Sequence, residues 1–184
     1  KRILEILKTD GLAGIISSRY FMESPTGTQL RGYLMKNANI LEIVDFYGAE
    51  IFKDIGVATA IYIFTRKCDE NNVIAVKKLV DDSYKFSNKD NLNELIKSKL
   101  FEEFTIKKAS LNEERWMLIS KEKSKIYKKI EAKAKYSLKD VATTFQGVIT
   151  GHDKAFVLAK EDLYEYNIEG ELVKNWIKNS HIEK

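Results

Sequence analysis

The amino-acid sequence predicts an α/β fold, because strand-like and helix-like segments alternate through the first part of the chain. Apolar runs occupy residues 12–16, 40–46 and 57–64, and a helix-like segment and a loop separate them. The high apolar density of these runs is typical of a sheet covered on both faces. Three strands do not complete a doubly wound sheet, so we expect the remaining strands to precede Lys1.

Two helices are expected beside these strands. Residues 2–8 carry apolar side chains that suit one helical face. The only proline, Pro25, marks a polar loop. Thr26 or Thr28 in this loop is suited to cap a second helix that runs to Met35.

Further elements are predicted beyond the third strand. They are a strand at residues 73–80, a helix at residues 91–100, and short strands at residues 104–108 and 116–120. Together with the preceding segments, they make up a first predicted domain, residues 1–120.

A strongly basic helix is predicted at residues 121–139. Its eight Lys and two Glu give it a local net charge of +6. This helix is the natural junction to a second domain, residues 121–184. Within that domain, residues 145–158 are predicted to form a strand pair with a glycine-rich bend.

The composition excludes several classes of protein. A hydrophobic content of 44% in 184 residues is typical of a globular protein, and the net charge of +4 is compatible with a nucleic-acid partner. The single cysteine, Cys68, excludes an internal disulfide, and neither His152 nor His181 has a Cys or carboxylate at ligand spacing, so no metal site is predicted. No apolar run reaches the roughly 20 residues of a membrane span, and the start lacks a signal-peptide pattern. We therefore expect a cytoplasmic protein without a membrane partner.

Several motifs follow one another in an informative order. The segment GLAGIISSRYF at residues 11–21 is followed by Leu30-Arg31-x-x-Leu34, the strand at residues 40–46, Gly48-Ala49-Glu50-Ile51-Phe52 and Val57-x-Thr59-Ala60-Ile61. This order resembles the later motifs of adenine-N6 DNA methyltransferases from restriction-modification systems. Residues 147–156 (GVITGHDKAF) and 172–178 (LVKNWIK) resemble the start of the target-recognition domain in the large Type II, Type IIG-like members.

The resemblance implies a partial Rossmann-like methyltransferase sheet followed by the edge of an α+β target-recognition domain. It also implies a parent protein that transfers a methyl group from S-adenosylmethionine to N6 of adenine in double-stranded DNA. The family's Phe-x-Gly-x-Gly cofactor loop and Asn-Pro-Pro-Tyr tetrapeptide are absent from this sequence, whose only proline is Pro25. We therefore expect a fragment with no catalytic residues and no bound cofactor of its own, with both motifs preceding Lys1.

Two other interpretations remain open. The chain could be a non-catalytic DNA-specificity or interaction module, or an unrelated α/β scaffold protein. The resemblance also leaves open the DNA recognition sequence and whether a restriction nuclease is fused to the protein or associated with it.

Phe52 is the first candidate site residue. A DNA methyltransferase extrudes its target base from the duplex, and the extruded base needs an aromatic face to lie against. The resemblance gives this role to Phe52, and base–aromatic stacking is worth about 1 to 3 kcal/mol. The alternative is a core aromatic packed between two strands.

Arg19 and the basic helix supply candidate DNA contacts. Arg19 follows a strand end, and loops at the carboxyl ends of parallel strands form the ligand crevice of α/β sheets, so a phosphate or sugar contact is expected. Lys125, Lys128 and Lys129 are candidates for phosphate contacts. The alternatives are a salt bridge for Arg19 and a solvated helix face for the lysines.

The glycine-rich bend offers backbone amides and polar side chains at a tight turn, which suits close approach to a DNA backbone. Its candidate DNA-binding residues are Gly147, Thr150, Gly151, His152 and Lys154. A structural hairpin turn is the alternative.

Overall fold

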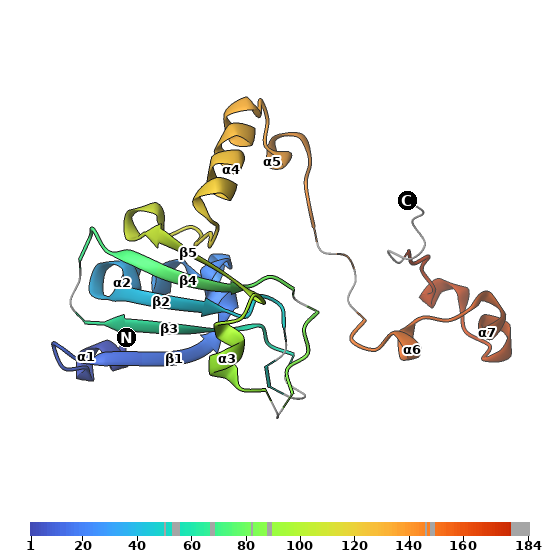
Figure 1. The fold of residues 1–184 in the computed structure, drawn as a ribbon. Helices are drawn as coiled ribbons and strands as arrows, with labels where there is room; N and C mark the ends of the chain where they lie inside the picture. The colour runs from blue at the N-terminus through green and yellow to red at the C-terminus, as the bar shows by residue number, and fades with distance from the viewer. Residues whose placement is uncertain are drawn as a thin grey trace. The chain divides into compact units, whose positions relative to one another are not determined.

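The computed structural model describes residues 1–49, 51–52, 56–66, 69–81, 83–87, 90–145, 147 and 150–177. The chain divides into two compact units, Lys1–Ala134 and Lys135–Lys184 (Figure 1). The first unit contains the sheet and also the basic helix. The domain boundary expected at residues 120–121 stays a prediction.

Among the described residues, a five-stranded mixed sheet forms the centre of the first unit. Its strands are β1 (Leu12–Ser18), β2 (Asn39–Asp45), β3 (Thr59–Thr65), β4 (Val73–Leu79) and β5 (Phe101–Lys107). They lie in the order β1-β3-β2-β4-β5, with β2 and β4 parallel and the other neighbouring pairs antiparallel. The predicted α/β class is confirmed. Because β3 runs in reverse between β1 and β2, the strands β1, β2 and β4 all run in one direction.

Both faces of the sheet are covered, as the apolar strands predict. Successive side chains of a strand point to opposite faces, and in β2 Ile43 joins one core cluster while Val44 joins the other. Side chains of α2 (Thr28–Asn37) and Trp116 pack in the first cluster. The second cluster packs against side chains of α3 (Leu92–Ile96).

The strand predicted at residues 116–120 is wrong, because this segment joins no sheet among the described residues. Alternate side chains of the segment are buried, which produces the period-two pattern of a strand. Its backbone bonds differently: the N–H of Trp116 donates to the carbonyl of Met22 at 2.8 Å. The indole ring packs edge-on against Phe21, with ring centroids 5.7 Å apart. The segment is therefore buried like a strand but pairs with no strand, which explains why its sequence pattern predicts a strand.

A buried arginine ties α2 to the neighbouring loops. The side chain of Arg31 is fully buried. All five of its guanidinium N–H groups donate, to the carbonyl oxygens of Phe21, Ser24 (2.8 Å), Glu113 (2.7 Å) and Glu114 (2.6 Å) and to the hydroxyl of Thr28 (3.0 Å). Gly27 lies so close that a side chain there would collide with this guanidinium and with the Phe21 carbonyl. Arg31 therefore joins two loops that are far apart in sequence.

α2 continues two residues past its predicted end at Met35, whereas the other predicted helices of the first unit are shorter than their sequence patterns indicate. α1 spans Arg2–Ile6, and α4 spans Lys121–Lys133 rather than continuing to residue 139. They end because the next residues, Leu7 and Ala134, have extended backbones. Short 3-10 helices complete the first unit: η1 (Arg19–Met22), η2 (Pro25–Gly27) and η3 (Lys108–Ser110).

In the described part of the second unit, the short helix α6 (Asp153–Phe156) occupies part of the segment 145–158, where a strand pair is expected. The other helices of this unit are α5 (Leu138–Val141), α7 (Lys160–Glu165) and the 3-10 helix η4 (Gly170–Leu172). The second strand of the predicted pair is therefore wrong. The first strand includes residues 146, 148 and 149, which lie outside the described residues, as do Cys68 and His181. The hydroxyl of Thr150 donates to Asp153 at 2.6 Å, a local contact that favours a turn and a helix start over a strand.

No helix in the described ranges is long and apolar enough to cross a membrane. In the same ranges, no group of His, Cys, Asp and Glu side chains has the arrangement of a metal site.

Candidate functional site

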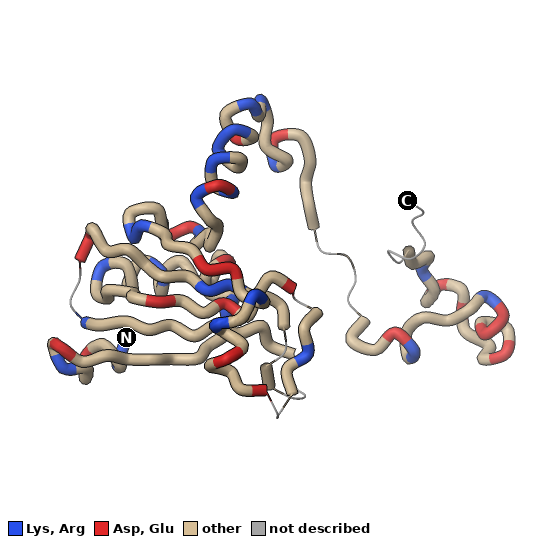
Figure 2. Tube along the Cα trace, in the orientation of Figure 1, with Lys and Arg blue, Asp and Glu red and all other residues tan. Residues whose placement is uncertain are grey.

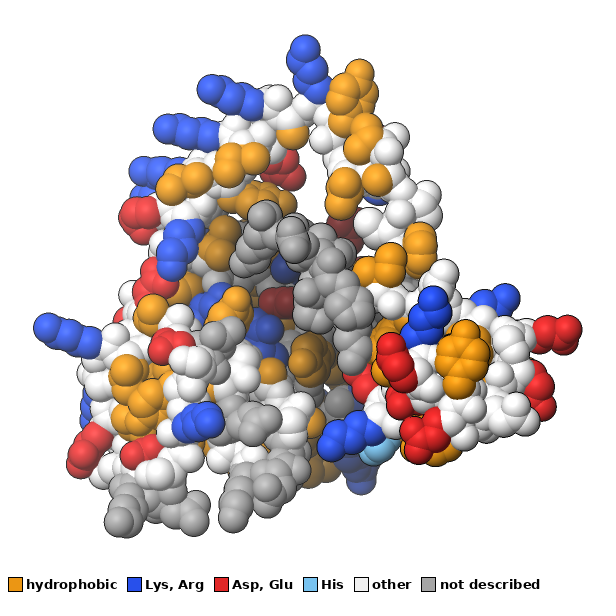
Figure 3. All heavy atoms as spheres, turned by 90° about the vertical axis from the view of Figure 1, so that its right-hand side faces the viewer, with side chains coloured by type: hydrophobic (Ala, Val, Ile, Leu, Met, Phe, Trp, Pro, Cys, Tyr) orange, Lys and Arg blue, Asp and Glu red, His pale blue; other side chains and the backbone are white. Residues whose placement is uncertain are grey.

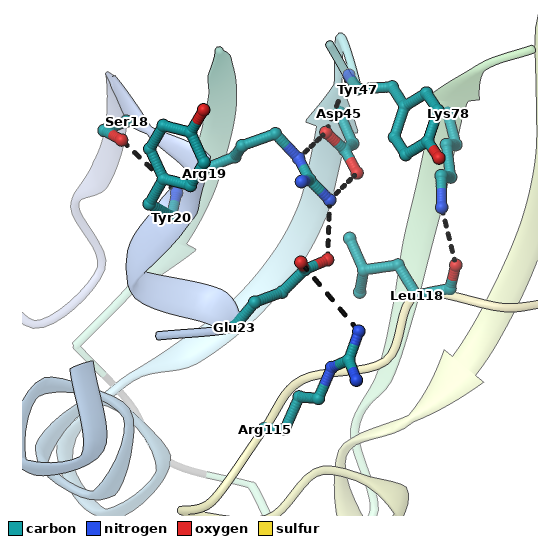
Figure 4. A network of polar contacts seen from close by, with 9 residues as sticks. All are labelled: Ser18, Arg19, Tyr20, Glu23, Asp45, Tyr47, Lys78, Arg115 and Leu118. Carbon is teal, nitrogen blue, oxygen red and sulfur yellow. Dashed lines mark hydrogen bonds and ion pairs between the residues drawn. The ribbon is translucent and has the colours of Figure 1, made fainter. Parts of the chain in front are cut away.

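One edge of the sheet collects charged and aromatic side chains. Because β1, β2 and β4 run in the same direction, their carboxyl ends lie at this edge. It carries η1 after β1, the loop after β2 and the last residues of β4 (Figure 4). The carboxyl ends of such strands form the ligand crevice in α/β sheets, so this edge is where a site is expected.

Arg19, the first residue of η1, is held by two carboxylates. Its Nε lies 2.9 Å from Asp45 Oδ1, and its Nη2 lies 3.2 Å from Asp45 Oδ2 and 2.9 Å from Glu23 Oε1. Burial opposes the guanidinium charge, but the hydrogen bonds and charges of Asp45 and Glu23 outweigh it and raise the pKa of Arg19 above its ordinary value. This geometry agrees with the salt-bridge interpretation, and a DNA contact by Arg19 stays a prediction.

Asp45 also holds the backbone of the loop that follows β2. Its Oδ1 accepts a hydrogen bond of 2.9 Å from the N–H of Tyr47. Tyr47 has a φ of 57°, in the left-handed region that residues with a Cβ seldom adopt. Two cations lie close to its ring, with the Arg19 guanidinium carbon 5.4 Å and the Lys78 Nζ 4.8 Å from the ring centroid.

Lys78 reaches this edge because the register of β4 places it opposite Asp45. Burial lowers the pKa of Lys78, an effect that the charge of Asp45 partly opposes. Its Nζ also donates to the carbonyl of Leu118 at 3.5 Å (Figure 4). Sequence reasoning did not single out Asp45, Tyr47 or Lys78. The one available signal was a carboxylate at the end of an apolar strand.

Phe52 lies in the loop after β2 and is 42% exposed. It belongs to neither core cluster of the described residues, whereas Phe46 and Ala49 before it are buried in the second cluster and Ile51 packs against that cluster. Glu50 and residues 53–55 lie outside the described residues. The environment of Phe52 differs from that of a core aromatic, and its base-stacking role stays a prediction.

The candidate lysines of α4 share one side of the helix. At 3.6 residues per turn, Lys125, Lys128 and Lys129 fall on one face, apart from the apolar Ile126 and Ile130. All three lysines are exposed. Figure 2 shows basic residues recurring along α4, and in Figure 3 basic side chains project in a row from the upper part of the view.

The bend residues belong to the second unit. Gly147, Gly151, His152 and Lys154 are exposed, and Thr150 is half-buried. Gly151 has a φ of 72°, which glycine adopts without strain. Their DNA contacts stay predictions.

Known proteins are similar to this chain, and the segment that ends at Phe52 matches a protein family. Residues 1–52 match the Eco57I restriction-modification methylase family. Over 92% of its length the chain is 28% identical to the Type II methyltransferase M.BstVI of Geobacillus stearothermophilus, covering 31% of that protein. A stretch covering 35% of the chain is 34% identical to 11% of the Type II methyltransferase M.BanIII of Aneurinibacillus aneurinilyticus. The predicted resemblance to restriction-modification methyltransferases is confirmed.

Solved structures of restriction-modification proteins are similar to parts of the chain. The M protein of the Type I restriction enzyme EcoKI aligns with 50% of this chain and 21% of its own at 22% identity, with a TM-score of 0.41. The type IIG restriction endonuclease BpuSI aligns with 58% of this chain and 13% of its own at 13% identity, with a TM-score of 0.42. The chain spans less than a third of the length of the curated relatives it matches.

Proposed function

We propose that this chain forms part of a site-specific DNA methyltransferase that transfers a methyl group from S-adenosylmethionine to N6 of adenine in double-stranded DNA. The observation that carries the proposal is the match of residues 1–52 to a restriction-modification methylase family. The exposed ring of Phe52, at the end of that match, supports a role for the chain in holding the target base. A cytoplasmic location and a fused or associated restriction nuclease stay predictions.

In this proposal the chain holds DNA and does not carry out the chemical step. An extruded adenine has lost its stacking neighbours, and the ring of Phe52 replaces one of them. Lys125, Lys128 and Lys129 contact phosphates, which positions the duplex without reading its sequence. The bend adds contacts from Gly147, Thr150, Gly151, His152 and Lys154. The polar tetrapeptide that would hold the adenine amino group is absent from the sequence.

We infer that the described residues do not hold S-adenosylmethionine by themselves. A glycine-rich turn after a strand leaves room for a cofactor to approach the backbone. The turn after β1 instead contains the buried side chain of Arg19, and the sequence has no Phe-x-Gly-x-Gly loop. No chemical step is therefore assigned to this chain.

The isolated chain is expected to bind no S-adenosylmethionine in a calorimetric titration, because it lacks the cofactor loop. The full-length protein that contains it serves as the positive control. A micromolar complex with the isolated chain, equivalent to a binding free energy of about 8 kcal/mol, would contradict the proposal that this chain holds DNA but not the cofactor.

A methylation assay tests the proposed reaction. The full-length protein should transfer labelled methyl groups from S-adenosylmethionine to duplex DNA, and digestion to nucleosides should recover the label as N6-methyladenine. Label on cytosine would overturn the adenine assignment. DNA binding without any label would favour the alternative, a non-catalytic DNA-specificity module.

Replacing Lys125, Lys128 and Lys129 together by Gln should weaken DNA binding and reduce its salt dependence. Each phosphate contact contributes about −0.9 to the slope of log K against log salt. The slope of the triple variant should therefore be shallower by up to about 3. Gel-shift titrations of the full-length protein at several salt concentrations measure it. The matched control replaces Lys8, Lys97 and Lys107, which are exposed on other parts of the first unit. Equal losses in both variants would show that net charge, not α4, governs binding.

A further inference from the structure

Tyr47 combines backbone strain with an unusual set of contacts. In the described residues, Tyr47 and Asn167 are the non-glycine residues with positive φ. A left-handed backbone costs a residue with a Cβ roughly 1–2 kcal/mol, and such strain persists only where the surroundings impose it. For Tyr47 the surroundings are visible in Figure 4, whereas no sequence pattern marks the position.

Three groups impose the conformation of Tyr47. The buried Asp45 carboxylate accepts its backbone N–H, and the cations of Arg19 and Lys78 lie beside its ring at 5.4 and 4.8 Å. Asp45 is itself fixed by its ion pair with Arg19. The turn is closed by a hydrogen bond of 3.1 Å from the N–H of Ala49 to the carbonyl of Phe46.

The loop is therefore anchored on both sides of its glycine-containing turn. Phe46 and Ala49 are buried in the second core cluster, and Ile51 packs against it. Between them, the ring of Tyr47 is held from outside the core by Arg19 and Lys78. Phe52, whose ring is exposed, follows this turn in the sequence.

We propose that Tyr47 is a positioning residue for Phe52: its ring, held by cation–π contacts with Arg19 and Lys78, fixes the loop that presents the base-stacking ring. This inference rests on the proposed function and extends it to a residue outside the predicted site. Tyr47 acts through Phe52 and does not touch the base. Loss of the ring should therefore change base capture more than fold stability.

The test uses the full-length protein and duplexes with 2-aminopurine at the mapped target adenine. Tyr47→Gly removes the ring and the strain, because glycine adopts positive φ freely. Tyr47→Asn removes the ring but keeps a side chain that tolerates this conformation. Both variants should melt at or near the wild-type temperature, yet capture the base about fivefold less well or worse, since two cation–π contacts are lost. Tyr47→Phe, which keeps the ring, should restore most of the capture.

Asn167→Gly is the matched control, because it relieves positive φ in the second unit and should leave the fluorescence unchanged. Wild-type fluorescence in both ring-less variants, with a reduced signal in Phe52→Ala, would overturn the role of Tyr47 alone. A Tyr47→Phe variant as weak as Tyr47→Gly would also overturn it, because the hydroxyl rather than the ring would then matter. A wild-type protein that methylates no adenine would overturn the proposed function and this inference with it.

Discussion

Arg31→Ala is expected to lower the free energy of unfolding by about 3 to 5 kcal/mol, because it removes a fully buried side chain and leaves its partly buried hydrogen-bond acceptors without a donor. These acceptors include the carbonyls of Phe21, Glu113 and Glu114, which lie on two loops distant in sequence. Arg31→Lys should recover little of the loss, since an ammonium has three donors and cannot reproduce the planar five-donor fork. Urea denaturation of the protein measures both variants.

Arg115→Ala is the matched control for Arg31. Its side chain is 57% exposed and its nitrogen lies 3.9 Å from Glu23, so its removal should cost less than about 1 kcal/mol. An Arg31→Ala variant whose denaturation midpoint equals that of Arg115→Ala would show that water satisfies the exposed carbonyls, and the structural role assigned to Arg31 would be wrong.

Phe52→Ala in the full-length protein is expected to lower the population of extruded adenine by roughly five- to more than a hundredfold. This range corresponds to the loss of about 1 to 3 kcal/mol of base–aromatic stacking. Phe52→Trp should keep most of the capture, because any aromatic face serves. The fluorescence of 2-aminopurine at the target position reports extrusion, and thermal melting reports the fold.

The melting temperature separates stacking from packing at Phe52. Because the residue is 42% exposed, its truncation should leave melting near that of the wild type. Phe46→Ala, which truncates a fully buried ring of the same loop, should cost about 3 to 5 kcal/mol of stability. A Phe52→Ala variant that melts like Phe46→Ala, yet captures the base normally while folded, would assign Phe52 to the core.

Much of the sheet could be predicted from local sequence, because its strands are short apolar runs with clear ends. Strands β1 to β4 fall within a few residues of the runs that predict them, and β5 begins three residues before its predicted start at residue 104. The segment at residues 116–120 misled the prediction, since it buries alternate side chains without pairing. The segment that forms α6 misled it too, because the hydrogen bond from Thr150 to Asp153 favours a helix start over a strand.

The candidate site was less predictable, since most of it depends on register and backbone geometry. Family resemblance pointed to Phe52, and its exposure agrees with that choice. Asp45, Tyr47 and Lys78 come together only through the pairing of β2 with β4 and a left-handed backbone at one residue. The periodicity of the sequence predicts neither the strand register nor the left-handed backbone. Arg19 was singled out as a DNA contact, whereas its carboxylate partners become visible only once the strand ends meet.

The register that sets Lys78 opposite Asp45 also bears on the order of folding. Partners in β2 and β4 are 33 residues apart in sequence, whereas partners in β1 and β3 are 41 to 53 residues apart. Because a longer loop costs more entropy to close, we expect β1 to join the sheet after β2, β3 and β4 have paired. Lys78 would then lie beside the Tyr47 ring first, and Arg19 would reach Asp45 and that ring last. In a partly folded chain the central strands would be paired before the contacts of Arg19 had formed.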